Sequence, residues 1–161
     1  MNNLIVHDFG KLKINQDGTW FHNDEKFNHQ GIAELFSRSI VKDSDDDNYY
    51  LKLGTNKVSF EYDITPYIII DIDFHDKELD FISNIGKIIS INEIKTLFLT
   101  EDSRILIKNE SKLYLLSKRA YNFILNYFDE DDNGYFIKID NFKLKLMNYS
   151  KYTRKEVKSK K

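Results

Sequence analysis

Two stretches, "NYYLKLGTNKVSF" (48–60) and "GYFIKIDNFKLKL" (134–146), follow nearly the same pattern and decide the predicted fold. A shift of 86 residues superposes them without a gap, so that Tyr50 falls on Phe136 and Lys57 on Lys143. Apolar and polar residues alternate along both stretches, which is the period of a half-buried β-strand. Each stretch therefore predicts two short antiparallel strands around a turn, at "GTN" in the first and at "DNF" in the second.

An amphipathic helix is predicted before each of these hairpins. In both segments apolar residues recur at i, i+3, i+4 and i+8, the spacing of one helix face. They are Ile32, Leu35, Phe36 and Ile40 in the first segment and Ala120, Phe123, Ile124 and Phe128 in the second. Asn28 and Ser117 are the predicted N-caps, because their side chains can accept hydrogen bonds from the first turn. A further hairpin precedes each helix, over 19–27 and 104–116.

The predicted fold class is therefore α+β, with two related hairpin-helix-hairpin repeats, antiparallel sheets and one main helix each. Because a unit of this size buries little surface alone, we expect the two repeats to pack together as one compact unit. We place the first repeat at residues 1–75, the second at 76–150, and a basic tail, predicted to be disordered, at 151–161. The segment between the helices, 62–91, is predicted to add further strands, with a turn at "HDKE" (75–78).

Composition narrows the classes of function. The chain has 161 residues, no cysteine, and no apolar run long enough for a membrane helix, so we expect a soluble cytoplasmic protein without disulfides or thiolate metal sites. The tail 151–161 holds six Lys or Arg and one Glu, which leaves 18 basic and 25 acidic side chains in residues 1–150. Such an acidic body argues against a nucleic-acid partner, since the usual basic groove is missing. Antiparallel edge strands leave pairing into a homodimer open.

Several short motifs, in order, resemble one known family. They are "DGTWFH" (17–22), "LFSR" (35–38), "YYL" (49–51), the Asp63 and Pro66 pair, and "LDFISNIG" (79–86). With them the chain resembles an uncharacterised bacterial family, domain of unknown function 1285, over most of residues 10–145. The resemblance implies an α+β fold with two related motifs per chain and a role in ligand-dependent signalling. It implies no reaction.

The resemblance also suggests a polar recognition site. The matching positions that could serve it are Trp20, His22, Arg38, Lys57, Asp63 and Asn84. The chain departs from the family at Leu53 and Gly54, at Lys87, and over "INEIK" (91–95), so its ligand can differ from that of its relatives. For Arg38 two interpretations stay open, an ion pair with Asp63 or recognition of an anion in a groove.

One acidic loop resembles a cation site. In "DEDDNGYFIKID" (129–140) the oxygen-bearing residues Asp129, Asp131, Asn133 and Asp140 stand at positions 1, 3, 5 and 12 of an EF-hand-like loop. Against this, position 12 lacks the long Glu, and the following segment alternates like a strand. The alternatives are weak Ca or Mg binding and a polar connection whose Asn-Gly makes a tight turn.

Catalytic motifs are missing from the sequence, which has no GxSxG, P-loop or GxGxxG pattern. The preferred prediction is a non-enzymatic regulatory or signalling module that binds a small ligand or a protein segment between the two repeats, without a cofactor. The weak Ca or Mg site is one alternative. An enzyme of unrecognised type, using His22 with a nearby carboxylate, is the other.

Overall fold

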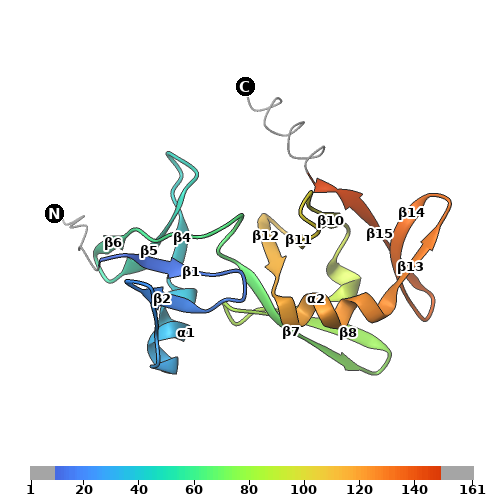
Figure 1. The fold of residues 1–161 in the computed structure, drawn as a ribbon, viewed down its shortest axis with the longest axis horizontal. Helices are drawn as coiled ribbons and strands as arrows, with labels where there is room; N and C mark the ends of the chain where they lie inside the picture. Colours follow the sequence, from blue (N-terminus) through green and yellow to red (C-terminus); the bar gives the residue numbers. More distant parts are fainter. Residues whose placement is uncertain (1–9, 150–161) are drawn as a thin grey trace.

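The structure is a computed structural model that describes residues 10–149. Its first unit, residues 12–58, consists of two three-stranded antiparallel sheets and one helix (Figure 1). The elements are β1 (Leu12–Ile14), β2 (Trp20–His22), β3 (Glu25–Lys26), α1 (Gln30–Arg38), β4 (Ile40–Lys42), β5 (Tyr49–Leu53) and β6 (Asn56–Val58). Along the chain they follow the predicted order of hairpin, helix and hairpin.

The second unit, residues 68–148, is built around one nine-stranded sheet. Its elements are β7 (Ile68–His75), β8 (Glu78–Ser83), β9 (Ile88–Ser90), η1 (Ile91–Glu93), β10 (Leu97–Leu99), β11 (Ile105–Asn109), β12 (Lys112–Leu116), α2 (Lys118–Ile124), η2 (Leu125–Tyr127), β13 (Phe128–Asp131), β14 (Gly134–Ile139) and β15 (Phe142–Asn148). The strand order is β13-β14-β15-β10-β11-β12-β7-β8-β9. Two of these pairs, β10 with β15 and β12 with β7, are parallel.

The predicted α+β class and the predicted hairpins are confirmed, but the sheets differ between the two proposed repeats. The hairpins of the first unit lie in separate sheets, and β1 meets the chain beyond β6 only through a parallel bridge of Lys13 with Glu61. The hairpins of the second unit share a single sheet, which also takes in β7, β8 and β9. The sheet arrangement therefore does not confirm the repeat.

The turns of the hairpins depend on residues that tolerate a left-handed backbone. Asn23 and Asp24 connect β2 to β3 with φ of 50° and 70°, and Asp76 and Lys77 connect β7 to β8 with φ of 49° and 64°. Two consecutive positive φ angles match the right-handed twist of the flanking strands in a two-residue hairpin. The turns predicted at "HNDE" and "HDKE" are thus confirmed.

Helix α1 corrects the predicted apolar face. Phe36 is buried as predicted, but Ile40 is buried in β4 beyond the end of the helix, and Ile32 and Leu35 are 37% and 55% exposed. The helix has only nine residues and rests on the first unit through Phe36 and Ser37, so the flank that bears Ile32 and Leu35 is left uncovered. The predicted cap at Asn28 is also wrong, because the Nδ1 atom of His29 accepts the hydrogen bond from the amide of Ile32 at 3.1 Å.

Helix α2 agrees with the sequence as far as Ile124, where it ends. Ala120 and Ile124 are fully buried and Phe123 is partly buried, whereas Phe128, predicted on the same helix face, begins β13 and is partly buried against the same core. The hydroxyl of Ser117 accepts a hydrogen bond from the amide of Ala120, as the predicted N-cap requires. The second helix thus buries the stripe that the first leaves half exposed.

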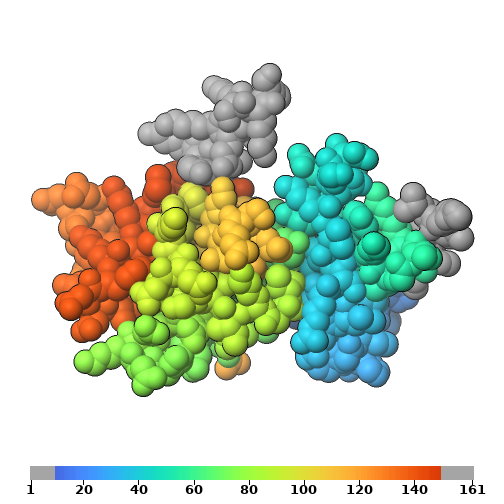
Figure 2. Space-filling model, turned by 180° about the vertical axis from the view of Figure 1, so that it is seen from behind, coloured from blue at the N-terminus to red at the C-terminus, as the bar shows by residue number. Residues whose placement is uncertain are grey.

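Aromatic rings connect the two units through the core. Trp20 contacts Phe36 of the first unit edge-on and Phe60, just beyond it, at a tilt, with ring centroids 5.5 and 5.2 Å apart. Tyr49 meets Tyr67, in the segment between the units, edge-on at 5.3 Å, and Tyr67 contacts Tyr114 of the second unit at 5.7 Å. Edge-on and tilted contacts of this kind suit the ring quadrupoles and add to the area that they bury. In the space-filling view the units lie side by side along one seam (Figure 2).

Polar contacts fix the same boundary. Arg104 in the β10–β11 turn forms an ion pair with Asp63, which lies in the segment between the units. The carboxylate of Asp17, in the β1–β2 loop, accepts a hydrogen bond from the amide of Lys118 at 2.9 Å. Strand β7 pairs with β8 and β12 in the second sheet, although the predicted first repeat extends to residue 75. Within residues 10–149 neither helix has the length and apolar character needed to cross a membrane.

Candidate binding groove between the two units

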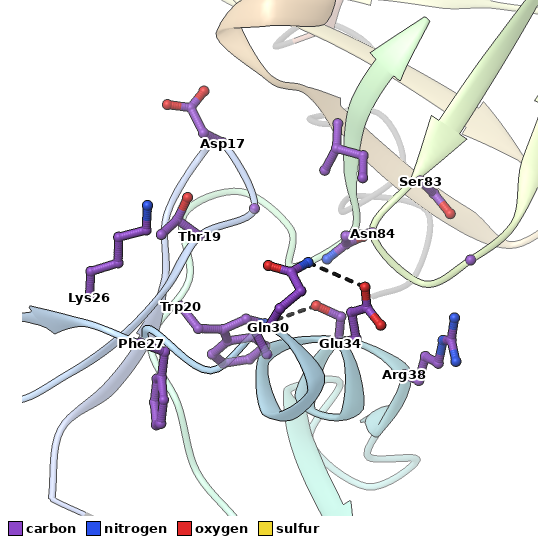
Figure 3. A pocket seen from close by; sticks show the side chains of 15 residues that line it. Asp17, Thr19, Trp20, Lys26, Phe27, Gln30, Glu34, Arg38, Ser83 and Asn84 are labelled. Atoms are coloured by element: carbon purple, nitrogen blue, oxygen red, sulfur yellow. Dashed lines mark hydrogen bonds between the residues drawn. The ribbon is translucent and has the colours of Figure 1, made fainter. Parts of the chain in front are cut away.

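A cavity of about 380 Å³ lies where α1 and the β1–β2 loop face the second unit (Figure 3). We call it the interunit groove. Its lining consists of Asp17, Gly18, Thr19, Trp20, Lys26, Phe27, Gln30, Ala33, Glu34, Ser37, Arg38, Ile70, Ser83, Asn84 and Gly86. Its volume falls within the range of small-molecule pockets, and boundaries between units are where such pockets commonly form.

One face of α1 supplies the floor of the groove. Gln30, Ala33, Glu34, Ser37 and Arg38 are spaced at i, i+3, i+4, i+7 and i+8, so they share one side of the helix. All five side chains are polar or small, and they are joined by the apolar Ile70 from β7. The same spacing could have shown this stripe in the sequence, where only the apolar positions of the helix were followed.

Arg38 is an available charge in the groove. Its side chain is exposed, and over residues 10–149 its guanidinium has no ion-pair partner. The guanidinium lies over Gly86 in the β8–β9 turn, since a Cβ atom added there would come within 3.6 Å of its Nε. Gly86 has a φ of 85°, which glycine adopts at little cost. The turn thus supports the arginine from below and leaves its donors free.

Opposite charges stand near Arg38 without neutralising it. Glu34 lies one helical turn earlier, at the spacing where Glu and Arg often pair. Its carboxylate instead accepts a hydrogen bond from the side-chain amide of Gln30 at 3.2 Å (Figure 3). Lys26 and Asp17 line the other end of the groove. The groove therefore presents charges of both signs, and a ligand with polar groups at two ends would suit it.

Two of the predicted recognition residues in the groove form hydrogen bonds that stabilise the fold. The indole nitrogen of Trp20 donates to the hydroxyl of Ser37 at 2.9 Å, and the ring is only 1% exposed. The side-chain oxygen of Asn84 accepts from the amide of Ile68 at 2.9 Å, and its nitrogen donates to the carbonyl of Pro66 at 3.0 Å. Trp20 and Asn84 thus shape the groove, and Arg38 remains the member free to bind.

The other three predicted residues lie outside the groove. Asp63 pairs with Arg104, so the suggested pair with Arg38 does not form. Lys57 forms an ion pair with Asp43 at 2.6 Å, and its ammonium lies 4.6 Å from the ring centre of Tyr50. This hydrogen bond lowers the pKa of Asp43 and raises the pKa of Lys57. Lys57 is thereby occupied within its own unit.

His22 does not meet the geometric requirement for acid–base chemistry. Its exposed ring is tilted against Phe27, and its Nε2 is 3.5 Å from the side-chain amide of Asn23. Within residues 10–149 no carboxylate forms a hydrogen bond or ion pair with this ring. The arrangement gives His22 no partner that could orient it as a base.

The acidic loop is divided between strands. Asp129 and Asp131 belong to β13, and Asp131 faces Gly134 at the start of β14. Asp140 lies at the opposite end of β14, about 20 Å away at the rise of a strand. The carboxylate of Asp131 accepts a hydrogen bond from the amide of Asn133 at 2.8 Å and forms an ion pair with the ammonium of Lys143 at 3.0 Å. The four predicted ligands are therefore not brought together, and no group of three metal-ligating side chains occurs in the described part of the chain.

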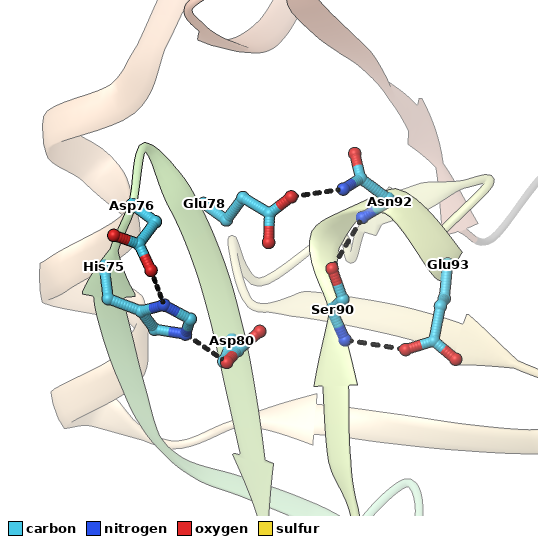
Figure 4. A network of polar contacts seen from close by, with 7 residues as sticks. All are labelled: His75, Asp76, Glu78, Asp80, Ser90, Asn92 and Glu93. Carbon is cyan, nitrogen blue, oxygen red and sulfur yellow. Dashed lines mark hydrogen bonds and ion pairs between the residues drawn. The ribbon is translucent and has the colours of Figure 1, made fainter.

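One histidine and two aspartates form a cluster at the β7–β8 turn that the sequence did not indicate (Figure 4). The Nε2 atom of His75 is 2.5 Å from the carboxylate of Asp80, and its Nδ1 is 3.5 Å from Asp76. The hydrogen bond to Asp80, followed by that to Asp76, raises the pKa of His75. Hairpin register explains why sequence reading missed it, because His75 and Asp80 become neighbours only once the turn is placed.

The comparisons with known proteins point to one family. Residues 6–64 match the family model described as the N-terminal domain of DUF1285, a domain of unknown function. A DUF1285 family protein from Silicibacter pomeroyi DSS-3 superposes with a TM-score of 0.62 at 18% identity, covering 89% of this chain and 83% of that one. A DUF1285 family protein from Shewanella baltica OS155 gives 0.52 at 22% identity, covering 76% and 96%. No curated protein matches the chain.

Proposed function

We propose that this protein, whose residues 6–64 match the N-terminal domain of the DUF1285 family, is a non-enzymatic binding module with its ligand in the interunit groove. The family match confirms the resemblance found in the sequence and carries no activity. The proposal therefore rests on the groove itself. Its ligand is a small molecule, or a protein segment that presents an equivalent group, and its role is regulatory because the ligand would touch both units.

The observation that carries this proposal is the guanidinium of Arg38 over the glycine turn, without an ion-pair partner within residues 10–149. An arginine in a cavity usually forms an ion pair, and an unpaired one offers up to five donors in a fixed plane for a carboxylate or phosphate. Here the plane rests on Gly86 of the second unit, whereas the side chain belongs to α1 of the first. A ligand bound to Arg38 would consequently be sensitive to how the two units are placed.

The groove lies between two units that we also propose to be copies of one ancestral unit. In the first unit Lys57 contacts Asp43 and the ring of Tyr50, and in the second Lys143 contacts Asp131 and the ring of Phe136 at 4.0 Å. The members of these trios differ in number by 86 or 88, the shifts that superpose the hairpins and helices in the sequence. Asp43 and Asp131 also each accept a hydrogen bond from the amide two residues on.

Thermal melting tests the binding proposal. The purified protein is melted with a panel of metabolites and nucleotides, first as wild type and then as Arg38→Gln and Arg119→Gln. A groove ligand at 100 times its Kd should add about 2.7 kcal/mol to the stability of the wild type. Arg38→Gln should lower the affinity by about tenfold or more, since it removes a charge-assisted contact.

Arg119→Gln is the matched control, because Arg119 is an exposed arginine on α2 that pairs with Asp71, and neither residue lines the groove. It should keep the full shift. If Arg38→Gln retains the ligand-induced shift of the wild type, the groove is not the binding site. An unaltered melting temperature without ligand would show that Arg38 has no structural role.

A further inference from the structure

A second cavity, of about 220 Å³, lies where the β10–β11 turn meets the start of α2. It is lined by Gln16, Ser103, Arg104, Leu116, Lys118 and Tyr121. We call it the α2 pocket. Apart from Gln16 of the β1–β2 loop, all of its lining comes from the second unit, and none of its residues lines the interunit groove.

The α2 pocket is the counterpart of the interunit groove in the second unit. The β1–β2 and β10–β11 turns match with a shift of 85, because the amides of Gly18 and Ser103 donate in the same way to the carbonyls of Asn15 and Thr100. Gly18 and Thr19 of the groove therefore correspond to Ser103 and Arg104 of the pocket. The helix shift of 88 carries Gln30 and Ala33 onto Lys118 and Tyr121. Most of the pocket lining is therefore equivalent to groove residues by the shifts that relate the two halves of the chain.

The differences between equivalent residues change both the size and the charge of the cavity. Arginine at the position of Thr19 and tyrosine at the position of Ala33 add bulk, which accords with the smaller volume of 220 Å³ against 380 Å³. Asp102, the counterpart of Asp17, pairs with Arg104 and does not line the pocket, and lysine at the position of Gln30 adds a cation. The groove contains acids and bases, whereas the pocket is lined by two cations and no carboxylate.

The two cations are not equally available. Arg104 is held by Asp63 and by Asp102, whose carboxylate is 2.9 Å from its Nε. Lys118 is exposed, and over residues 10–149 its ammonium has no ion-pair partner. Beside it are the buried Leu116 and the half-buried ring of Tyr121. One free positive charge next to an apolar surface suits an anion of single charge that carries a short apolar group.

We propose that the α2 pocket binds a small organic monocarboxylate, with its carboxylate at the Lys118 ammonium and its apolar part against Leu116 and Tyr121. The hydroxyl groups of Ser103 and Tyr121 and the amide of Gln16 are the neutral donors at this site. The proposal goes beyond the groove ligand and does not depend on it, because the two cavities have separate linings.

The probe is butyrate, and butyramide serves as a neutral analogue of nearly the same shape. Binding of each compound to the full chain is measured by amide-resolved NMR. Butyrate should give saturable shift changes at residues 103–104 and 116–121, and butyramide should give none. Lys118→Gln should weaken butyrate binding by about tenfold, equivalent to about 1.4 kcal/mol. Lys95→Gln, which alters an exposed lysine outside the pocket, should leave the affinity unchanged.

Equal effects of butyrate and butyramide would overturn the proposal, as would butyrate shifts confined to residues outside the pocket or the absence of any saturable change. Retention of full affinity in Lys118→Gln would overturn it as well. None of these results affects the groove proposal, because binding in the groove is measured by shift changes at Arg38 and Gly86 and not at residues 103–121.

Discussion

The indole of Trp20 depends on one hydrogen bond inside the first unit. Its partner Ser37 is itself buried, so Ser37→Ala leaves the indole N–H without an acceptor. A buried donor that loses its partner costs about 1–3 kcal/mol. We expect Ser37→Ala to lower the free energy of unfolding by that amount in urea denaturation. Ser44→Ala, at an exposed serine, is the control and should change it little. Equal stability of the two variants would show that the hydrogen bond contributes nothing.

His75 gives the second unit a pH dependence of known sign. Its pKa is raised because Asp80 and then Asp76 stabilise the charged ring, so the cluster stabilises the fold at pH values below the ordinary pKa of histidine. That stabilisation is lost as the pH rises through the raised pKa of the folded state. NMR titration of the ring protons should show a lower His75 pKa in Asp80→Asn than in the wild type. An unchanged titration would mean that the pair does not form in solution.

Single residues show how much of the candidate site can be predicted from the sequence. Arg38 and Asn84 were both predicted as recognition residues, yet the side chain of Asn84 is held by backbone groups, and that of Arg38 has no ion-pair partner within residues 10–149. The side chain of Asn84 forms hydrogen bonds with the backbone of Pro66 and Ile68, which are 18 and 16 residues away in the chain. Residue type and motif indicate that a side chain is polar and near a site. Its partners depend on packing between distant segments, which no local pattern contains.

The two helices allow the stability cost of a buried apolar residue to be compared with that of an exposed one. Ile124→Ala on α2 should cost about 2–5 kcal/mol, because it leaves a cavity in a closed core. Leu35→Gln on α1 should change the stability by less than about 0.5 kcal/mol, because the side chain is 55% exposed. Urea denaturation of both variants measures the contrast. A cost for Leu35→Gln that approaches that of Ile124→Ala would mean that something covers this face of α1 in solution.

The elements themselves were predicted well from the sequence because they depend on local periods. Alternation placed the hairpins, and the i, i+3, i+4 spacing placed both helices. Which strand joins which sheet was not predicted, since the parallel pairs β10 with β15 and β12 with β7 connect segments far apart in the chain. The cap at His29 was missed for a different reason, because an imidazole nitrogen can replace the amide oxygen expected from Asn28.

For the whole molecule, the boundary between the units determines where a ligand can bind. Asp17 joins the units directly, because its carboxylate accepts a hydrogen bond from the amide of Lys118. The segment between the units is held to the second unit by Asp63 with Arg104 and to the first by Tyr67 with Tyr49. These contacts keep the groove and the α2 pocket in fixed relation to the same boundary. A ligand in either cavity would therefore stabilise the association of the two units.

The most direct test of the central claim is amide-resolved NMR with the compound that shifts the melting temperature most. We expect the largest changes on both sides of the boundary, at Gly18, Ala33 and Arg38 of the first unit and at Gly86 of the second. We also expect Arg38→Gln to weaken these changes by about tenfold. Changes confined to one unit away from the groove, or changes that Arg38→Gln leaves intact, would contradict the claim.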